Sequence, residues 1–326
     1  MVKTNSLKAW VLAARPKTLT GAIAPVLVGG AFAYARILRD TPNFIQDFNS
    51  SILQFFNSSF LLCLLFAIFM QIDANLINDY FDFRKGTDRE DRLGPERACA
   101  QGWITPRAMQ WGIGIMTVLS CLVGIGILLV HTQWELLIVG ILCVLFCFLY
   151  TTRLSYLGWG DLLVLIFFGL IPVIFTYYVM TDGGWNIPLV IAGFAMGMAT
   201  DNLLMVNNYR DRNQDCVSGK RTIVVRMMES RIKRYGEEKG RIETEQDAAD
   251  IYLWLGVFST ILAFVALFLY PFSSIRYPLM LIYLILHFRT FRQLKSLEGK
   301  ALNQVLGATA RNIFLFGLLL AVSVFL

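Results

Sequence analysis

The sequence has very little of the residue type that most often carries hydrolytic and zinc chemistry. Its 326 residues include only two histidines, His131 and His287, and neither has partners suited to a catalytic triad or a zinc site. The six cysteines show no Cys-x-x-Cys spacing, and most fall within apolar segments, where small apolar packing is their expected role. These absences argue against a histidine triad and against a cysteine or histidine metal centre.

Charged residues are also scarce, at 16% of the chain, whereas 56% of the residues are hydrophobic and fall in long runs. This composition is typical of an integral membrane protein, whose helices need about 20 apolar residues to cross the hydrocarbon layer. The sequence therefore predicts an all-α membrane protein with nine transmembrane helices in one membrane-embedded domain, residues 1–326. The predicted spans lie near residues 18–35, 58–78, 110–130, 134–150, 161–180, 188–207, 250–270, 277–289 and 308–326.

The positive charges predict the orientation of these helices, because cytoplasmic loops collect Lys and Arg. With the N-terminus inside, 26 of the 29 basic residues fall in cytosolic segments, and only Arg36, Arg39 and Arg276 lie outside. We therefore expect a multi-pass protein of the inner or cytoplasmic membrane, with two long cytosolic loops, residues 84–107 and 212–248. The net charge of +6 then faces anionic lipid, and no basic groove with interleaved aromatic residues favours a nucleic-acid partner.

Two carboxylate-rich segments stand where the second and sixth predicted spans end. Asn78-Asp79-Tyr80-Phe81-Asp82 runs on to Asp88, and Asn207-Asn208-Tyr209-Arg210-Asp211 runs on to Asp215. Ionisable groups at the rim of a membrane domain are functional by default. The similarity of the segments suggests two related halves of about four helices each, with a ninth helix added. Independent acquisition of the same chemistry at both helix ends is the alternative.

Helical spacing predicts that each segment presents its polar side chains on one face, since residues three, four or seven apart are neighbours on a helix. The two sets are Asn75, Asp79 and Asp82, and Asn208, Asp211 and Asp215. Mg²⁺ prefers a few carboxylates together with phosphate oxygens and waters. Two such helix ends facing each other would hold metal ions that bridge a diphosphate and allow an allylic carbon–oxygen bond to ionise. Helix capping explains one Asp at a helix end, but not two sets on one side of the membrane.

Basic residues follow both segments. The first is followed by Arg84, Lys85, Arg89, Arg92 and Arg97, and the second by Gly219-Lys220-Arg221-Thr222. Lys220 and Arg221 lie beside a glycine, a few residues after Asp215, and we expect them to contact phosphate. Four basic residues further along are expected to be solvated at the lipid surface: Arg231, Lys233, Arg234 and Lys239.

Three further residues carry weaker signals. Tyr150, at the cytosolic end of the fourth span, is placed to stabilise a carbocation with its ring face, and an interfacial tyrosine is the alternative. Asp73 and Asp201 lie deeper in the second and sixth spans. They would orient a substrate or pair with a buried basic residue.

The two aspartate-rich segments resemble the motifs of the UbiA superfamily of intramembrane aromatic prenyltransferases, whose members have nine helices. In many members the third Asp of the first motif stands seven residues after the first, whereas this sequence has Gly86 there and Asp88 two residues later. Other stretches are similar to the branch that prenylates 1,4-dihydroxy-2-naphthoate. They are Ala14-Arg15-Pro16-Lys17-Thr18-Leu19, Asn75-Leu76-Ile77-Asn78-Asp79-Tyr80, Gly94-Pro95-x-Arg97 and Gly219-Lys220-Arg221-Thr222.

The resemblance implies a UbiA-like bundle with cytosolic cap loops and a Mg²⁺-dependent reaction of menaquinone biosynthesis. In that reaction polyprenyl diphosphate prenylates 1,4-dihydroxy-2-naphthoate, with loss of CO₂ and diphosphate, to give demethylmenaquinol. The implied Mg²⁺ ligands are Asp79, Asp82, Asp88, Asp211 and Asp215, and the implied diphosphate contacts are Asn78, Asn208, Lys220, Arg221 and Arg97. The alternatives are another aromatic acceptor, such as 4-hydroxybenzoate or homogentisate, and an ion-coupled transporter.

Overall fold

The computed structural model describes residues 2–40, 56–86, 92–270 and 278–326, and every regular element within these ranges is a helix. Short polar side chains begin several helices, since Asn57, Thr105, Asn186 and Thr222 each accept a hydrogen bond from the backbone N–H three residues later. The helices are α1 (Leu7–Ala14), α2 (Thr20–Asp40), α4 (Ser58–Lys85), α5 (Pro106–His131), α6 (Glu135–Leu149), α7 (Gly160–Leu165), α8 (Ile171–Met180), α9 (Ile187–Val217), α10 (Ile223–Tyr235), α11 (Glu237–Leu269), α12 (Pro278–Ser296) and α13 (Leu302–Phe325).

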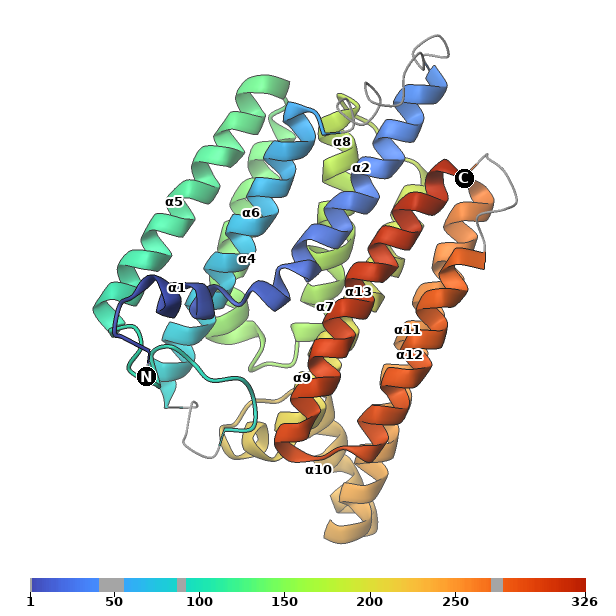
Figure 1. The fold of residues 1–326 in the computed structure, drawn as a ribbon. Helices are drawn as coiled ribbons and strands as arrows, with labels where there is room; N and C mark the ends of the chain where they lie inside the picture. The colour runs from blue at the N-terminus through green and yellow to red at the C-terminus, as the bar shows by residue number, and fades with distance from the viewer. Residues whose placement is uncertain (1, 41–55, 87–91, 271–277) are drawn as a thin grey trace.

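The long helices stand side by side in one bundle, and α1 lies across one end of it (Figure 1). The N-terminus lies at that end and the C-terminus at the other. Helix α10 and the adjoining ends of α9 and α11 also project from the N-terminal end (Figure 1). The chain segments around both carboxylate motifs are therefore brought to the same end of the bundle.

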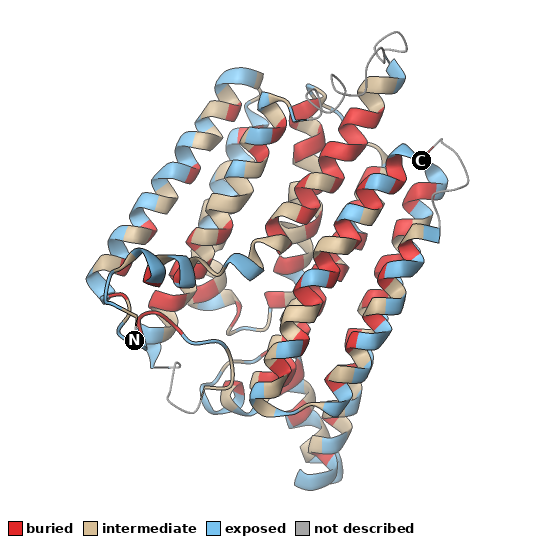
Figure 2. Cartoon of the chain, viewed as in Figure 1, coloured by how far each residue is buried: buried red, intermediate tan, exposed pale blue. Residues whose placement is uncertain are grey.

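Burial is uneven across the bundle, as Figure 2 shows, with α2 and α9 largely covered and α5 and α6 largely exposed. Close backbone contact explains part of this, because a Cβ on Gly169 would lie only 2.5 Å from Gly193 O and Gly197 Cα of α9. Gly169 belongs to a π-helical turn, Ile166–Leu170 (η4), between α7 and α8. Small residues therefore draw η4 against the central helix, as is common inside membrane bundles. The exposed apolar surface of α5 and α6 suits contact with lipid.

Eight helical segments of the described residues are long and apolar enough to cross a membrane, which agrees with a multi-pass integral membrane protein. The predicted span 277–289 corresponds to α12, apart from residue 277, which lies outside the described residues. Helix α12 packs against α11 and α13, but Arg289, Arg292 and Lys295 in its last turns prevent it from qualifying as an apolar span. The predicted count of nine is therefore not confirmed.

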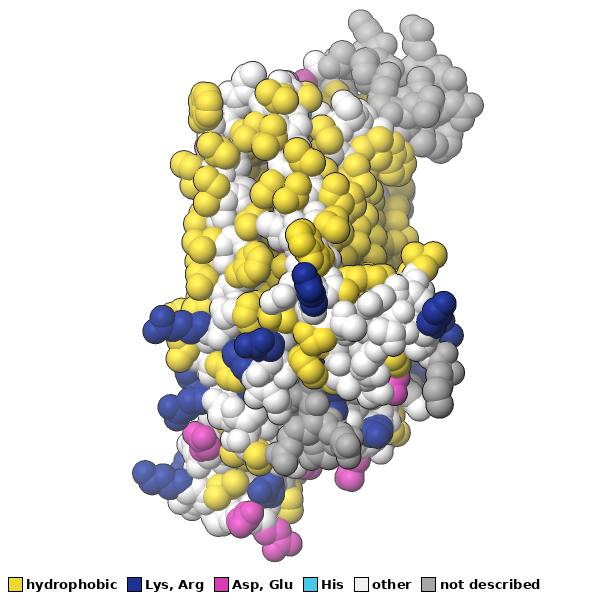
Figure 3. Space-filling model, turned by 90° about the vertical axis from the view of Figure 1, so that its left-hand side faces the viewer, with side chains coloured by type: hydrophobic (Ala, Val, Ile, Leu, Met, Phe, Trp, Pro, Cys, Tyr) yellow, Lys and Arg dark blue, Asp and Glu magenta, His cyan; other side chains and the backbone are white. Residues whose placement is uncertain are grey.

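The segment 212–248, predicted as a loop, is mostly helical and corrects that expectation. Helix α9 continues to Val217, α10 covers Ile223–Tyr235, and α11 begins at Glu237. The reason is an apolar side of α10, where Val224, Val225 and Met228 are buried against the neighbouring helices. On the face shown in Figure 3, Lys and Arg gather towards this end, below a broad hydrophobic band.

Candidate active site

A cavity of about 450 Å³ runs between the helices and changes character along its length. At one end it is lined by carboxylates, amides and basic side chains of both motifs. Further in, it is lined by aromatic and aliphatic side chains of α4, α6, η4 and α8. The polar residues include Asn78, Asp82, Arg92, Arg97, Asn207, Asn208, Arg210, Asp211, Gln214, Asp215 and Lys220, and the apolar ones include Phe66, Met70, Leu136, Val139, Phe146, Phe167, Phe168 and Phe175.

One stripe of α4 faces the cavity. It consists of Gln71, Asn75, Asn78 and Asp82, whose spacing keeps them within one narrow sector of the helix. Asp79 is not among the cavity residues, and the expected face of Asn75, Asp79 and Asp82 is therefore wrong in this respect. Asn78, and not Asp79, lines the cavity beside Asn75 and Asp82.

The carboxylate of Asp79 holds the loop that follows α4. Its two oxygens accept hydrogen bonds from the backbone N–H groups of Ala98 and Cys99, each at 2.8 Å. Arg15 Nη2 approaches the same carboxylate at 3.8 Å, and Asp79 is only 1% exposed. A buried carboxylate with both oxygens bonded in this way fixes the loop backbone, and this geometry disfavours its service as a metal ligand.

The loop held by Asp79 positions Arg97 at the polar end of the cavity. Arg97 Nη2 lies 3.1 Å from Asp82 Oδ2, and both side chains are largely buried. The pair places a fixed positive charge beside a carboxylate at the polar end of the cavity.

The corresponding stretch of α9 contributes Asn208, Asp211 and Asp215, and all three line the cavity. Arg210 holds the carboxylate of Asp211 through two hydrogen bonds of 2.7 Å each. Arg210 is only 3% exposed and also donates to Asn207 Oδ1 at 2.9 Å. In the second motif, as in the first, a buried arginine therefore fixes a carboxylate of the cavity.

Arg210 also joins the two motifs. Its Nη1 donates to Asn303 Oδ1 of α13 at 2.8 Å, and Asn303 Nδ2 donates to Leu93 O in the first loop at 2.8 Å. Gly94 leaves room for this contact, because a Cβ there would lie 2.7 Å from Arg210 Nη2. The loop after the first motif is therefore packed directly on the arginine of the second.

The two predicted phosphate contacts after the second motif lie in different places. Lys220 lines the cavity with its Nζ 4.0 Å from Asp215 Oδ1. The side chain of Arg221 is 62% exposed, pairs with Glu229 at 3.4 Å and is not part of the cavity wall. Lys85 lies near the ring of Tyr156, 3.6 Å from its centroid.

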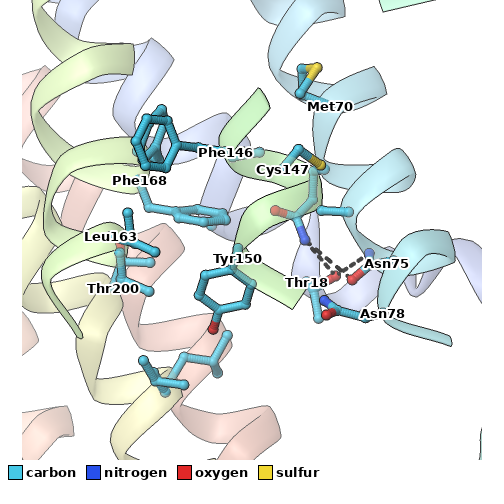
Figure 4. A pocket seen from close by; sticks show the side chains of 18 of the residues that line it. Thr18, Met70, Asn75, Asn78, Phe146, Cys147, Tyr150, Leu163, Phe168 and Thr200 are labelled. Atoms are coloured by element: carbon cyan, nitrogen blue, oxygen red, sulfur yellow. Dashed lines mark hydrogen bonds between the residues drawn. The ribbon is translucent and has the colours of Figure 1, made fainter. Parts of the chain in front are cut away.

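Tyr150 begins a π-helical turn, Tyr150–Leu154 (η3), and its ring projects into the cavity (Figure 4). The next residue, Thr151, donates a hydrogen bond to the side-chain oxygen of Asn78. Because that oxygen is engaged, the amide N–H groups of Asn78 are the atoms available to an anion. The aromatic ring of Tyr150 therefore stands beside the polar end of the cavity.

Three acidic residues lie apart from the cavity or outside the described ranges. Asp88 falls within residues 87–91, which lie outside the described residues. Asp73 accepts a hydrogen bond from Thr117 of α5 at 2.6 Å, and neither Asp73 nor Asp201 is part of the cavity wall.

The donor set at the polar end fits a divalent cation that arrives together with phosphate. Asp82 and Asp215 lie within electrostatic range of each other and of Lys220, and Asp211 completes the carboxylates of the cavity. In the ranges that the structure describes, no three His, Cys, Asp or Glu side chains converge into a metal cluster. Mg²⁺ suits such a site, since it completes its coordination with substrate phosphates and waters.

Several cavity residues were not singled out from the sequence. Gln71 and Gln214 belong to polar positions on the inward faces of α4 and α9, and Arg210 stands within the second motif. The sequence could have indicated Arg210, because an arginine inside an apolar helix requires a buried partner.

Comparison with known proteins gives four consistent matches. The profile of the UbiA prenyltransferase family matches residues 22–306. The chain is 35% identical to the 1,4-dihydroxy-2-naphthoate octaprenyltransferase of Haemophilus influenzae, over 73% of this chain and 72% of that protein. It is 36% identical to the enzyme of the same name from Escherichia coli, over 70% and 71% of the respective chains. The fold is similar to a UbiA homolog from Archaeoglobus fulgidus bound to DMAPP and Mg²⁺, with a TM-score of 0.58, 16% identity and coverage of 96% of this chain and 99% of that one.

Proposed function

The chain belongs to the UbiA prenyltransferase family, and from that premise we propose that it prenylates 1,4-dihydroxy-2-naphthoate in menaquinone biosynthesis. The donor is a polyprenyl diphosphate, and the products are demethylmenaquinol, CO₂ and diphosphate. One observation carries the proposal: a single cavity joins a carboxylate- and cation-lined end to an apolar interior. This is the shape and polarity of a diphosphate attached to a long isoprenoid chain.

The residues at the polar end bind and orient the diphosphate. Asp82, Asp211 and Asp215 would hold Mg²⁺, which supplies charge neutralisation of the leaving group when bound. Asn78 and Lys220 donate hydrogen bonds and charge to phosphate oxygens. Arg97 and Arg210 fix the carboxylates by the ion pairs described above.

The apolar part of the cavity excludes water from the reacting carbon. The C1–oxygen bond of the donor breaks with its electron pair passing to diphosphate, and the ring of Tyr150 stabilises the allylic cation. The acceptor carbon that bears the carboxyl group forms the new carbon–carbon bond. Loss of CO₂ leaves its bonding electrons in the ring and restores aromaticity.

The test is an assay of the purified protein in detergent or lipid with Mg²⁺, a polyprenyl diphosphate and one aromatic acceptor at a time. We expect prenylated product and one CO₂ per turnover with 1,4-dihydroxy-2-naphthoate. Product with 4-hydroxybenzoate or homogentisate, but not with the naphthoate, would overturn the acceptor assignment. Substrate uptake into sealed vesicles without diphosphate release would indicate a transporter instead.

We also propose that the polar end of the cavity faces the cytosol. The basic residues concentrate in the segments predicted to be cytosolic, which is the signature of cytoplasmic loops. A single cysteine at Arg153, in a variant that lacks the six natural cysteines, should react with an impermeant maleimide only in inverted membrane vesicles. Labelling in right-side-out vesicles would refute the orientation.

A further inference from the structure

A second cavity, of about 290 Å³, lies between α12 and α13 and shares no lining residue with the candidate active site. Its wall includes Arg289 and Gln293 of α12 and Gln304 and Arg311 of α13. The turn between the two helices, Gly299–Ala301 (η6), lies at the end of the bundle that carries the carboxylates (Figure 1). We call this second cavity the α12–α13 groove.

The groove carries positive charge that the protein does not neutralise. Residues 278–326, which form both helices, contain five basic side chains and a single acidic one, Glu298. Arg289 and Arg311 are exposed, and neither forms an ion pair or a side-chain hydrogen bond with any residue that the structure describes. Arg311 also belongs to a segment that is apolar enough to span a membrane. An arginine on the surface of such a helix calls for an anionic partner, which here must come from outside the chain.

Buried hydrogen bonds fix the two helices against each other beside the arginines. Asn312 Nδ2 donates to Thr290 Oγ1 at 2.9 Å, and Thr290 Oγ1 donates to Leu286 O at 2.9 Å. Asn312 and Thr290 are each only 2% exposed. Because they directly follow Arg311 and Arg289 in the chain, they hold the backbone that carries both arginines. The groove is therefore preformed, which lowers the cost of binding a ligand there.

The chemistry of the wall selects an anion that also carries hydroxyl groups. Arginine binds phosphate oxygens well, because its N–H groups match their geometry and charge. The amides of Gln293 and Gln304 can both donate to and accept from hydroxyl groups. A ligand with an ammonium group of its own would be repelled by the two arginines. These properties favour the headgroup of an acidic phospholipid over that of a zwitterionic one.

An exposed apolar stripe leads from the groove along both helices, away from η6. Ile282 stands seven residues before Arg289, and Leu318 seven residues after Arg311, so that each shares a helix face with its arginine. Ile282 is 44% exposed and Leu318 is 40% exposed. A lipid headgroup in the groove would therefore have its acyl chains against an apolar surface, whereas a free phosphate would make no use of that surface.

We propose that the α12–α13 groove binds an acidic phospholipid. Arg289 and Arg311 contact the phosphate, and Gln293 and Gln304 contact headgroup hydroxyls. Basic pockets between membrane-spanning helices are suited to such headgroups. This site is distinct from the proposed prenyl transfer site, and its test does not depend on prenyl transfer.

The experiment measures lipid binding to the detergent-solubilised protein by native mass spectrometry and by the shift in the thermal unfolding midpoint. The lipids are phosphatidylglycerol and phosphatidylcholine with the same acyl chains. The unchanged protein should bind phosphatidylglycerol at least about tenfold more tightly than phosphatidylcholine. Arg289→Gln combined with Arg311→Gln should remove this preference. Arg292→Gln combined with Lys300→Gln is the charge-matched control, because both residues are exposed but do not line the groove, and it should retain the preference.

Gly307→Leu tests the groove without changing its charge. Gly307 lines the groove, and a Cβ there would meet no other atom within 4 Å, so the variant should fold normally while its side chain fills the space. Its affinity for phosphatidylglycerol should fall about tenfold. Unchanged affinity in both the double arginine variant and Gly307→Leu would refute the site. Equal stabilisation by soluble glycerol phosphate and by phosphatidylglycerol would show that the groove binds free phosphate, and would refute the assignment to a lipid.

Discussion

The ends of α4 and α9 carry similar residues but use them differently. Asn78 and Asp82 on α4 correspond to Asn207 and Asp211 on α9, and all four line the cavity. The middle position differs, because Asp79 bonds the backbone of its own loop, whereas the corresponding Asn208 lines the cavity. The comparison teaches that each motif contains both cavity residues and residues that hold neighbouring structure, and that the type of side chain alone does not separate them.

Neutralising one cavity carboxylate on each helix should have the largest effect. Asp82→Asn and Asp211→Asn should each lower kcat/KM by at least about 100-fold, because each removes a negative charge from the proposed cation site. Prenyl transfer and thermal unfolding of the detergent-solubilised variants are the measurements. Full activity in both variants would remove the basis of the metal site, and a loss in one alone would show that the two motifs are not equivalent.

Substitutions of Asp79 and Asn208 test directly whether these two corresponding positions have different roles. Asp79→Ala should lower the free energy of unfolding by about 3 kcal/mol, since it leaves two buried N–H groups of the loop without their charged acceptor. Asn208→Ala should reduce activity while the unfolding midpoint changes little. If Asp79→Ala unfolds like the unchanged protein yet loses activity, Asp79 belongs with the cavity residues after all.

The contact between the first loop and Arg210 should show an intermediate effect. Gly94→Ala places a methyl group 2.7 Å from Arg210 Nη2, and we expect the guanidinium to shift relative to Asp211. We expect kcat/KM to fall about tenfold, as one charged hydrogen bond is weakened. Gly114→Ala on α5 is the control, because its Cβ meets open space, and it should leave activity unchanged. Equal activities in the two variants would show that the contact between the first loop and Arg210 does not affect the reaction.

The sequence predicted the apolar helices and the inward set on α9, but it did not predict the direction of Asp79. Helical spacing gives the angle between two side chains, not which sector of the helix meets the cavity. That sector is decided by Ala98 and Cys99, whose backbone N–H groups arrive from about twenty residues along the chain. The same holds for Arg221, whose direction depends on Glu229 of α10, a helix within the predicted loop.

Replacing Lys220 or Arg221 should give the smallest changes in activity. The two variants test which residue after the second motif lines the cavity. Lys220→Ala should raise the KM of the prenyl diphosphate about tenfold, because its ammonium group lines the polar end beside Asp215. Arg221→Ala should change that KM by less than about twofold, since an exposed ion pair contributes little and is screened by salt. Kinetics at low and high ionic strength measure both. A larger effect for Arg221 than for Lys220 would mean that the loop after α9 turns Arg221 into the cavity when substrate binds, and that the second motif, like the first, depends on a loop to complete its site.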